Sequence, residues 1–339
     1  MILADLNSFG KNILITGGNS GIGFYCLVNL LEKRNNLYVP LKSKSRKDKL
    51  LNQLSKYFDC KFLNDHLQII EDVDFSDLFN INKIKEYLLE KKIKFDVIIL
   101  NAGMQYTGST YPKVSKQGIE LTFAVNHLAH FYLINLIYKF INDSNESRIL
   151  ITSSDVHNPK SSGGNIGEKA GLKSLKNFKE EINSPFKGFN ADRSYKNSKL
   201  CNILFAKKLV KIIKNSNKTI SVITWAPGLV FPEDELGFFR YSSKFNKIGY
   251  LIFSNLANNF LGISESVKDA GKILFEIVFD KKYNAIDYVH LSNKLIGFKK
   301  HRLSEADISE EASDSKLADE LWNLSEDLCI SSGINLINI

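Results

Sequence analysis

A tyrosine and a lysine stand four residues apart, Tyr195 and Lys199, in a segment that predicts a helix over 191–213. Residues at this spacing share one face of a helix, about 6 Å apart along its axis. A free phenol has a pKa near 10, too high for easy proton exchange at neutral pH, and a neighbouring ammonium favours the phenolate and lowers that value. The pair therefore predicts acid–base chemistry at Tyr195.

Two further polar residues fit the same chemistry. Ser154 follows an apolar run over 148–152 that predicts a buried strand, and open parallel sheets bind ligands at the carboxyl ends of their strands. Its hydroxyl could donate a hydrogen bond to a substrate carbonyl. Asn126 lies in a long predicted helix over 118–141, where asparagine is a poor helix former. A polar task, such as holding a water next to Lys199, would explain its presence.

Taken one at a time, these residues have ordinary structural explanations, because a tyrosine with a lysine four positions later is common on any helix. Their order along the chain and their places on the predicted elements make the set specific. The sequence therefore predicts a catalytic group of four residues, which are Tyr195, Lys199, Ser154 and Asn126.

A glycine-rich turn lies between the first predicted strand, 12–16, and a predicted helix over 21–33. Glycines there let the backbone approach a pyrophosphate, and the helix N-terminus offers free N–H groups and the positive end of its dipole. A plain glycine-rich turn is the alternative, but the position between a strand and a helix favours a ligand. We therefore expect a dinucleotide, with contacts from Gly17, Asn19, Ser20, Gly21, Ile22 and Gly23.

The end of the second predicted strand, 37–41, indicates which dinucleotide to expect. A carboxylate there would accept hydrogen bonds from the ribose 2′-hydroxyl, whereas a basic side chain would pair with a 2′-phosphate. Lys42 follows the strand, Lys44 and Arg46 come next, and no carboxylate precedes Asp48. The alternative is a solvated helix start. In the context of the glycine turn, the basic run favours NADP(H).

Two more segments complete the expected nucleotide contacts. Asp74 comes just after the third predicted strand, 67–71, where its carboxylate could hold the adenine amino group. Asn101, Ala102 and Gly103 close the fourth predicted strand. Small residues at that point let the backbone pass close to the adenine ribose.

The elements that must position these residues follow from an alternation of short β-rich runs with longer helical segments. Six such runs indicate an α/β fold, a doubly wound parallel sheet with helices on both faces. The expected strands are 12–16, 37–41, 67–71, 96–100, 148–152 and 219–225, and the expected helices are 21–33, 47–58, 81–91, 118–141, 191–213, 264–279 and 315–329.

Two long segments, 157–190 and 231–263, fall outside this alternation, and such segments in a compact domain are usually binding loops or lids. The aromatic residues within 238–253 could line an apolar substrate pocket, contact a membrane surface or belong to ordinary packing. We expect one catalytic domain over residues 1–290, which includes both loops, and a C-terminal extension over 291–339 that packs on it.

The overall composition excludes several classes of protein. The 339 residues carry 45 Lys and Arg against 37 Asp and Glu, a net charge of +8, but the charge is spread along the chain rather than gathered as in a nucleic-acid binder. No apolar run reaches the ~18 residues of a membrane span, and the N-terminus does not resemble a signal peptide. The four cysteines lie far apart, which argues against disulfides and zinc and favours the cytoplasm.

Some conspicuous residues are expected only to pack. The two histidines of the long helix have no third ligand at a metal-binding spacing, so no metal site is expected. These packing residues are His127, His130, Trp225, Trp322, Cys26 and Cys60.

Together, these motifs resemble the short-chain dehydrogenase/reductase family. The matching pieces, in the family's order, are TGGNSGIG at 16–23, NAG at 101–103, NHLAHF at 126–131, TSS at 152–154, YKNSK at 195–199 and PG at 227–228. The resemblance implies a Rossmann-type domain. It implies that Tyr195 donates the proton, Lys199 holds the nicotinamide ribose, Ser154 contacts the substrate and Asn126 belongs to a proton relay. The cofactor contacts that it implies here are Tyr195, Lys199, Pro227, Gly228 and Val230.

Two branches of that family look most similar, the light-dependent protochlorophyllide reductases and the retinol-dehydrogenase-like enzymes, since both share the YxxSKxCN pattern found at 195–202. Segments 163–175, 261–272 and 309–328 resemble an insertion, a substrate-side helix and a C-terminal helix of the first branch. That branch implies hydride transfer from NADPH to a ring double bond of a tetrapyrrole. The alternative is a carbonyl or alcohol oxidoreductase of a lipophilic substrate.

A third hypothesis, from another class, is a non-catalytic NADP-binding regulator. The intact set of Ser154, Tyr195 and Lys199 argues against it, because a binding protein has no need of a tuned phenol. The expected partner is a small lipophilic or tetrapyrrole molecule and not a nucleic acid. Peripheral membrane contact remains an alternative to a purely cytoplasmic location, and the sequence indicates no oligomeric state.

Overall fold

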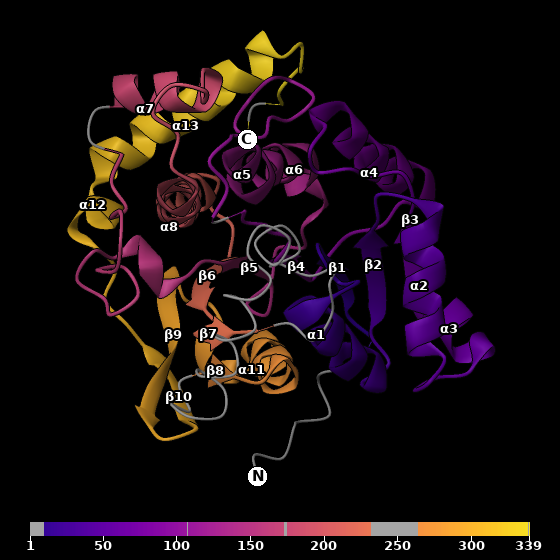
Figure 1. The fold of residues 1–339 in the computed structure, drawn as a ribbon. Helices are drawn as coiled ribbons and strands as arrows, with labels where there is room; N and C mark the ends of the chain where they lie inside the picture. The colour runs from indigo at the N-terminus through magenta and orange to yellow at the C-terminus, as the bar shows by residue number, and fades with distance from the viewer. Residues whose placement is uncertain (1–9, 107, 173–174, 232–263, 338) are drawn as a thin grey trace.

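The computed structural model describes residues 10–106, 108–172, 175–231, 264–337 and 339. The aromatic segment 238–253 therefore lies outside the described residues. Helices α1 (Gly21–Glu32) and α11 (Val267–Phe279) lie on one side of a central sheet, and α6 (Ala129–Ile137) and α8 (Ala191–Asn215) lie on the other (Figure 1). Within the described residues, no helix is both long and apolar enough to cross a bilayer.

The central sheet has eight strands in the order β10-β9-β6-β5-β4-β1-β2-β3. Every neighbouring pair is parallel except β9 with β10. The strand order reverses between β1 and β4, and ligands of doubly wound sheets bind in the crevice at such a point. The strands are β1 (Asn12–Ile15), β2 (Asn36–Pro40), β3 (Leu67–Ile70), β4 (Val97–Leu100), β5 (Arg148–Thr152), β6 (Ser221–Ala226), β9 (Tyr288–Gly297) and β10 (Lys300–Glu305).

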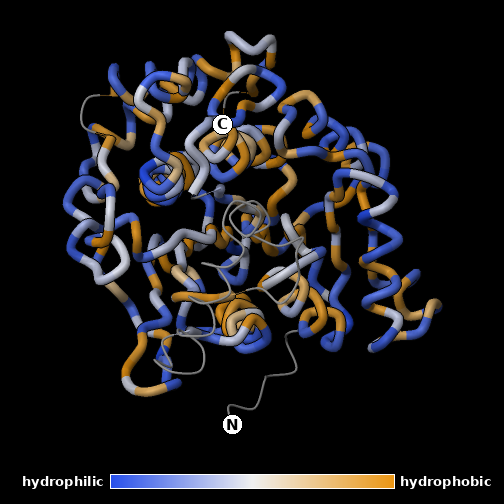
Figure 2. Tube along the Cα trace, viewed as in Figure 1, coloured by the Kyte–Doolittle hydropathy of each residue, from blue (hydrophilic) through white to orange (hydrophobic). Residues whose placement is uncertain are grey.

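Helices cover both faces of this sheet because its central strands are buried on both sides, as parallel strands require. All four residues of β4 and all five of β5 are buried. Figure 2 shows α8 and α11 end-on, each with an orange apolar side and a blue polar side. The α1–α11 contact is close, since a Cβ on Gly271 would lie 2.5 Å from the Cβ of Tyr25.

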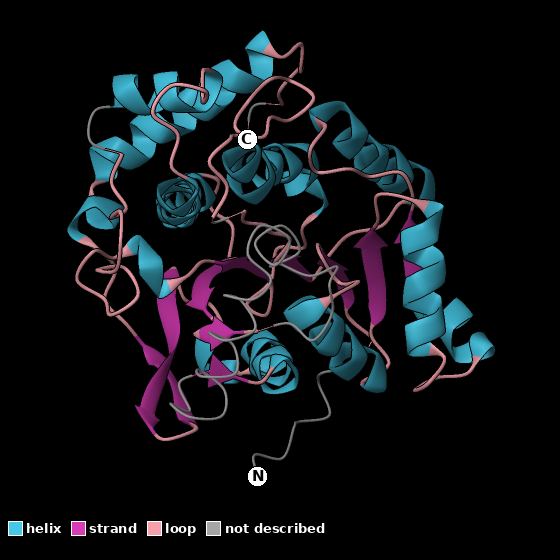
Figure 3. Ribbon diagram, viewed as in Figure 1, coloured by secondary structure: helices cyan, strands magenta, loops and turns pink. Residues whose placement is uncertain are grey.

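The remaining elements extend these layers (Figure 3). A second, small sheet pairs β7 (Leu229–Val230) with β8 (Ser264–Glu265). The other helices are α2 (Lys44–Leu54), α3 (Cys60–His66), α4 (Leu78–Lys91), α5 (Leu121–Phe123), α7 (Leu175–Asn183), α12 (Glu310–Ser313) and α13 (Ser315–Ser331), with a π-turn at Ala124–Leu128 and 3₁₀ turns at Tyr138–Phe140, Asp155–His157 and Lys281–Tyr283.

Helix α13 forms an outer layer on α8. The Trp322 ring stacks on the Phe205 ring with centroids 5.9 Å apart and meets the Phe131 ring edge-on at 4.8 Å. Asp319 pairs with Lys208 and Lys211 at 2.8 and 3.1 Å. The C-terminal segment is thus held to α8 by apolar area and aromatic geometry, with exposed ion pairs adding little.

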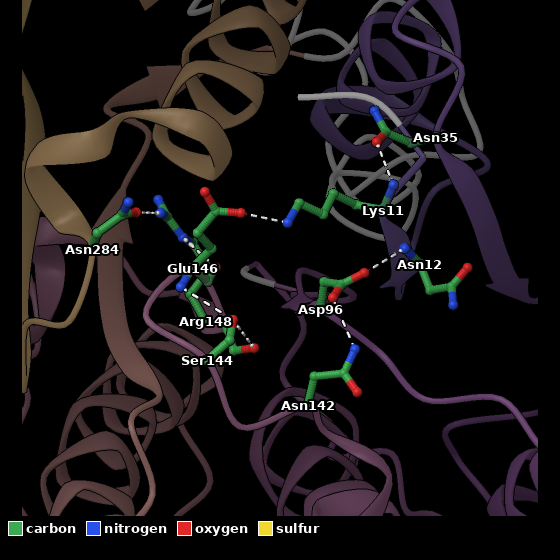
Figure 4. Close-up of polar contacts among 10 residues, drawn as sticks. Lys11, Asn12, Asn35, Asp96, Asn142, Ser144, Glu146, Arg148 and Asn284 are labelled. Atoms are coloured by element: carbon green, nitrogen blue, oxygen red, sulfur yellow. Dashed lines mark hydrogen bonds and ion pairs between the residues drawn. The ribbon is translucent and has the colours of Figure 1, made fainter. Parts of the chain in front are cut away.

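At the amino ends of the strands, opposite the expected site, polar side chains fix neighbouring strands to one another (Figure 4). Asp96 accepts hydrogen bonds from the Asn12 backbone at 2.9 Å and from the Asn142 amide at 2.8 Å. Arg148, which is only 2% exposed, donates to the carbonyl of Ile277 at 2.9 Å and to Asn284. Burial lowers the pKa of this guanidinium to about 10, and backbone acceptors satisfy it.

The α/β fold and the six predicted strands are confirmed within one or two residues. The sequence missed β9 and β10, and the domain boundary expected at residue 290 falls inside β9, which pairs with β6. The first part of the expected extension therefore belongs to the central sheet. Polar and basic residues from 292 onward hide the alternation that predicts a strand, because β9 is buried only over its middle residues.

Two other expectations need correction. The single helix expected over 118–141 is instead α5, a π-turn, α6 and a 3₁₀ turn in succession. Cys60 is exposed at the start of α3 rather than buried, whereas Cys26 is buried. Trp225 and Trp322 are core residues as expected, 0% and 5% exposed.

Candidate active site

The turn between β1 and α1 is tightly packed at two of its glycines, Gly17 and Gly23. Gly17 has φ +70°, and a Cβ there would lie 2.9 Å from the Cα of Ala102. A Cβ on Gly23 would lie 2.3 Å from the carbonyl oxygen of Gly17. Helix α1 begins at Gly21, and no side chain caps its first turn. Its N-terminal N–H groups are therefore available to an anion.

Thr16, quoted above only as part of a motif, joins the ends of β1 and β4. Its hydroxyl oxygen accepts hydrogen bonds from the backbone N–H groups of Asn101 and Ala102, both at 2.9 Å. It also lies 3.0 Å from Nε2 of His130. These contacts bring Asn101, Ala102 and Gly17 together beside the crevice. A threonine at the end of a predicted strand was the signal in the sequence.

Lys42 and Asp74, expected as separate contacts to the nucleotide, lie against each other at the ends of β2 and β3. Their charged groups are 2.7 Å apart. Burial raises the pKa of Asp74, but hydrogen bonds from Lys42 and Ser76 outweigh it and hold that pKa below its ordinary value. Helix α2 begins two residues after Lys42, and no side chain caps its N-terminus. A lysine and an uncapped helix end together suit an anion at this edge.

Tyr195 and Lys199 lie on α8 facing the carboxyl ends of β5 and β4. The ammonium of Lys199 lies 5.6 Å from the centroid of the Tyr195 ring and donates to the carbonyl of Thr152 at 3.1 Å. Ser154 hydrogen-bonds the Tyr195 side chain. The three residues expected to act together are therefore adjacent.

Burial dominates the electrostatics of this group. Burial raises the pKa of the Tyr195 phenol, and the hydrogen bond from Ser154 lowers it by less. Burial lowers the pKa of Lys199 to about 8. The pKa of the phenol stays above its ordinary value because burial opposes the phenolate more strongly than the hydrogen bond from Ser154 favours it. At neutral pH, Tyr195 holds its proton and Lys199 is mostly charged.

The side chain of Asn126 has fixed protein partners. Its amide oxygen accepts from the N–H of Met104 at 2.8 Å, and its amide nitrogen donates to the Met104 carbonyl at 3.0 Å and to the Ser198 hydroxyl at 3.0 Å. The expected task, holding a water beside Lys199, stays a prediction. These hydrogen bonds join the segment after β4 to α8 at a π-turn, a feature that often marks functional sites.

His157 is a residue near Ser154 that the sequence analysis missed. Its Nδ1 lies 2.7 Å from the carbonyl oxygen of Ser154, and its Nε2 accepts from the N–H of Ser309 at 3.3 Å. Asp155, the residue after Ser154, accepts a hydrogen bond from the hydroxyl of Ser292 in β9 at 2.7 Å. The Ser154 turn is thus held by β9 and the segment before α12. The only signal in the sequence was a histidine three residues after Ser154.

The Pro227–Gly228 turn lies beside β9. Gly228 has φ +81°, and a Cβ there would lie 2.8 Å from the carbonyl oxygen of Asn293. The Asn293 amide lies 3.4 Å from the carbonyl of Pro227. Val230 follows in β7 and pairs with Glu265 of β8. Among the described residues, no cluster of His, Cys, Asp and Glu side chains is arranged to hold a metal ion.

Comparison with known proteins places this site in context. Residues 11–166 match the family model of the short chain dehydrogenases. Retinol dehydrogenase 14 of Mus musculus is 31% identical over 227 residues, which is 65% of this chain and 61% of that protein. The chloroplastic protochlorophyllide reductase of Cucumis sativus is 27% identical over 265 residues, which is 76% of this chain and 63% of that protein.

A solved structure also shares the fold. L-sorbose reductase from Gluconobacter frateurii, crystallised with NADPH and L-sorbose, superposes with a TM-score of 0.59 over 84% of this chain and 95% of its own, at 14% identity. The chain spans a little over 60% of the length of the two relatives named above.

Proposed function

Because the chain belongs to the short-chain dehydrogenase/reductase family, we propose that it is an NADP(H)-dependent oxidoreductase in which Tyr195 exchanges a proton with a lipophilic substrate. The observation that carries the proposal is the contact of three side chains at the carboxyl end of β5. Ser154 hydrogen-bonds Tyr195, and Lys199 lies 5.6 Å from its ring. A cofactor-binding protein without catalysis has no need of this arrangement.

The residues around β1 and β2 fit a phosphorylated dinucleotide. The uncapped N-terminus of α1 and the glycines at 17 and 23 would receive the pyrophosphate. Lys42 and the uncapped N-terminus of α2 would receive a 2′-phosphate, with Lys42 leaving Asp74 to do so. Asn101, Ala102 and Gly103 would lie along the adenine ribose. NADPH, when bound, would supply the hydride.

The proton chemistry follows from the two shifted pKa values. A phenol whose pKa is raised by burial keeps its proton at neutral pH, so Tyr195 suits the role of donor in a reduction. Once the proton has left, the Lys199 ammonium faces the phenolate and stabilises it. The Ser154 hydroxyl would hold the substrate oxygen in line with Tyr195. His157 would keep Ser154 in place through a hydrogen bond to the backbone carbonyl of Ser154.

For the substrate, we propose a tetrapyrrole. The alignment with the cucumber protochlorophyllide reductase covers 76% of this chain, more than the alignment with the retinol dehydrogenase. The segment after Ser154 and the C-terminal helix, which resemble that branch, both contact α8, through Gly171 with Asn197 and through Trp322 with Phe205. The reaction would then be light-dependent reduction of a ring double bond.

The second candidate is reduction or oxidation of a retinoid-like carbonyl or alcohol. Two observations favour it. The retinol dehydrogenase is the more identical of the two relatives, at 31%. A serine hydroxyl that is hydrogen-bonded to a tyrosine is also suited to binding a single substrate oxygen atom.

One experiment separates the candidates. The purified full chain is mixed with NADPH and either protochlorophyllide or a panel of retinal and long-chain aldehydes, and absorbance is followed in darkness and after a flash. A red-shifted pigment product after the flash alone supports the tetrapyrrole. NADPH consumption in darkness with an aldehyde supports the second candidate. Tight NADPH binding without turnover of any substrate would contradict an oxidoreductase and favour the regulator.

A further inference from the structure

The hairpin formed by β9 and β10 ends in an apolar tip that is open to solvent. Leu295, Ile296 and Phe298 are 44%, 60% and 63% exposed. The hairpin forms one edge of the sheet and extends away from the helical layers (Figure 1), and its tip carries apolar positions in orange (Figure 2). Three large apolar side chains within four residues are an unusual group for a solvent-exposed turn.

Basic side chains surround this tip. The exposed cations are Lys294, Lys299, Lys300 and Arg302. Across the described residues, none of the four forms an ion pair with a carboxylate. Lys294 lies directly opposite Arg302 in the antiparallel register, and like charges at that position destabilise a hairpin. The arrangement therefore favours an anionic partner that would offset the repulsion.

We propose that this tip docks on an anionic lipid bilayer, with Leu295, Ile296 and Phe298 entering the interface and the four cations facing lipid headgroups. A few apolar side chains with adjacent lysines are sufficient for reversible attachment to such a surface. A stable protein interface buries about 800 Å² on each partner, which three side chains on a narrow turn do not supply. Lipid is therefore the occupant that size and charge favour.

The hairpin is rooted beside the candidate active site. Asn293, one residue before the exposed part, contacts the Pro227–Gly228 turn, and Ser292 holds Asp155 next to Ser154. Docking at the tip would bring the site within reach of molecules dissolved in the bilayer. This consequence rests on the proposed function, whereas the docking itself does not.

The test is flotation of the full chain with vesicles of phosphatidylcholine alone or with about a third phosphatidylglycerol. We expect binding to the anionic vesicles that weakens with added salt. The double variant Ile296→Ser with Phe298→Ser, and separately Lys299→Gln with Lys300→Gln, should each lower the partition coefficient at least tenfold. The matched controls are Phe79→Ser, at a side chain 51% exposed on α4, and Lys61→Gln on α3. Both controls should leave the partition coefficient unchanged.

Equal binding of the tip variants and the controls would overturn the proposal, as would a wild-type chain that stays unbound. A third outcome would also overturn the proposal: the wild type self-associates without binding vesicles, and the Ile296→Ser/Phe298→Ser variant loses that self-association. The tip would then be assigned to contact with a second copy of the chain. NADPH affinity, measured on the same samples, should be equal in all variants. Failure of docking with intact NADPH binding is thus distinguishable from failure of the proposed function.

Discussion

The two halves of the candidate site are built in different ways. Around β1, β2 and β4, the site consists of residues that directly follow a strand, and their positions are fixed by backbone contacts such as that between Gly17 and Ala102. Around β5, the turn that carries Ser154 is fixed by hydrogen-bonding groups far along the chain. The hydroxyl of Ser292 and the backbone N–H of Ser309 reach it across 137 and 152 positions.

This difference indicates what each half should tolerate. Apart from the hydrogen bonds of Thr16, the first half depends on close backbone approach, so added atoms should damage it. The second half depends on individual hydrogen bonds, so their removal should affect Ser154 and leave the nucleotide in place. The predictions below test that division, beginning with the largest expected effect.

Gly23→Ala should damage the first half most. The new Cβ would lie 2.3 Å from the Gly17 carbonyl oxygen, so the turn must shift. Overpacking of this kind costs about 2–3 kcal/mol, which corresponds to an NADPH Kd raised about 30–100-fold. Fluorescence titration with NADPH measures it. Gly297→Ala is the control, since its Cβ would meet no atom within 4 Å and Gly297 does not have a positive φ, and equal loss in both variants would argue against the close contact.

A pH profile tests the charge of Lys199. Its pKa of about 8 means that the ammonium is present below pH 8 and lost above it. In the direction of reduction, kcat/KM for NADPH should therefore fall about tenfold per pH unit above pH 8. This parameter reports the ionisation of groups in the free enzyme. Lys199→Arg keeps its charge at these pH values, so the decline should disappear even if the rate is lower throughout. A decline that persists unchanged in this variant would assign it to another group.

His157 tests the second half. His157→Phe removes the hydrogen bonds to Ser154 and Ser309, and a lost hydrogen bond of about 1–1.5 kcal/mol corresponds to roughly tenfold in kcat. The Kd for NADPH should stay within twofold. His157→Asn can still donate to the Ser154 carbonyl and should recover part of the rate. A variant that loses NADPH affinity instead would show that the two halves are not separate.

Lys42→Ala should have the smallest effect, because the side chain is 60% exposed and water screens its charge. We expect the ratio of kcat/KM for NADPH to that for NADH to fall about three- to tenfold, with NADH nearly unaffected. Lys61→Gln, at an exposed lysine on α3, is the control. An unchanged ratio would place the 2′-phosphate elsewhere.

The same division explains what the sequence could predict. The glycine turn, Lys42, Asn101 and the Tyr195–Lys199 pair were found because strand ends and helical spacing are local features. The neighbours of Ser154 were missed because they come from β9 and the C-terminal segment, and no local pattern joins residue 157 to residue 309. The side-chain partners of Asn126 were missed for the same reason, since Met104 and Ser198 lie on other elements.

The pKa of Tyr195 illustrates a second limit. Spacing on a helix predicts that Lys199 is near, but it does not give the depth at which both groups are buried. Burial raises the pKa of the phenol and lowers the pKa of the lysine. Helical spacing therefore identified the neighbour of Tyr195, whereas the burial that shifts both pKa values is not a local feature of the sequence.

The most direct test of the account is the rate of substrate-dependent NADPH oxidation by Tyr195→Phe, measured beside its NADPH Kd. Removing one hydroxyl leaves the ring and its contact with Lys199 in place, so the Kd should be unchanged. The rate should fall about 100-fold or more, the contribution of a positioned proton donor. A Tyr195→Phe variant that turned over substrate at the wild-type rate would contradict the role of Tyr195 as the proton donor.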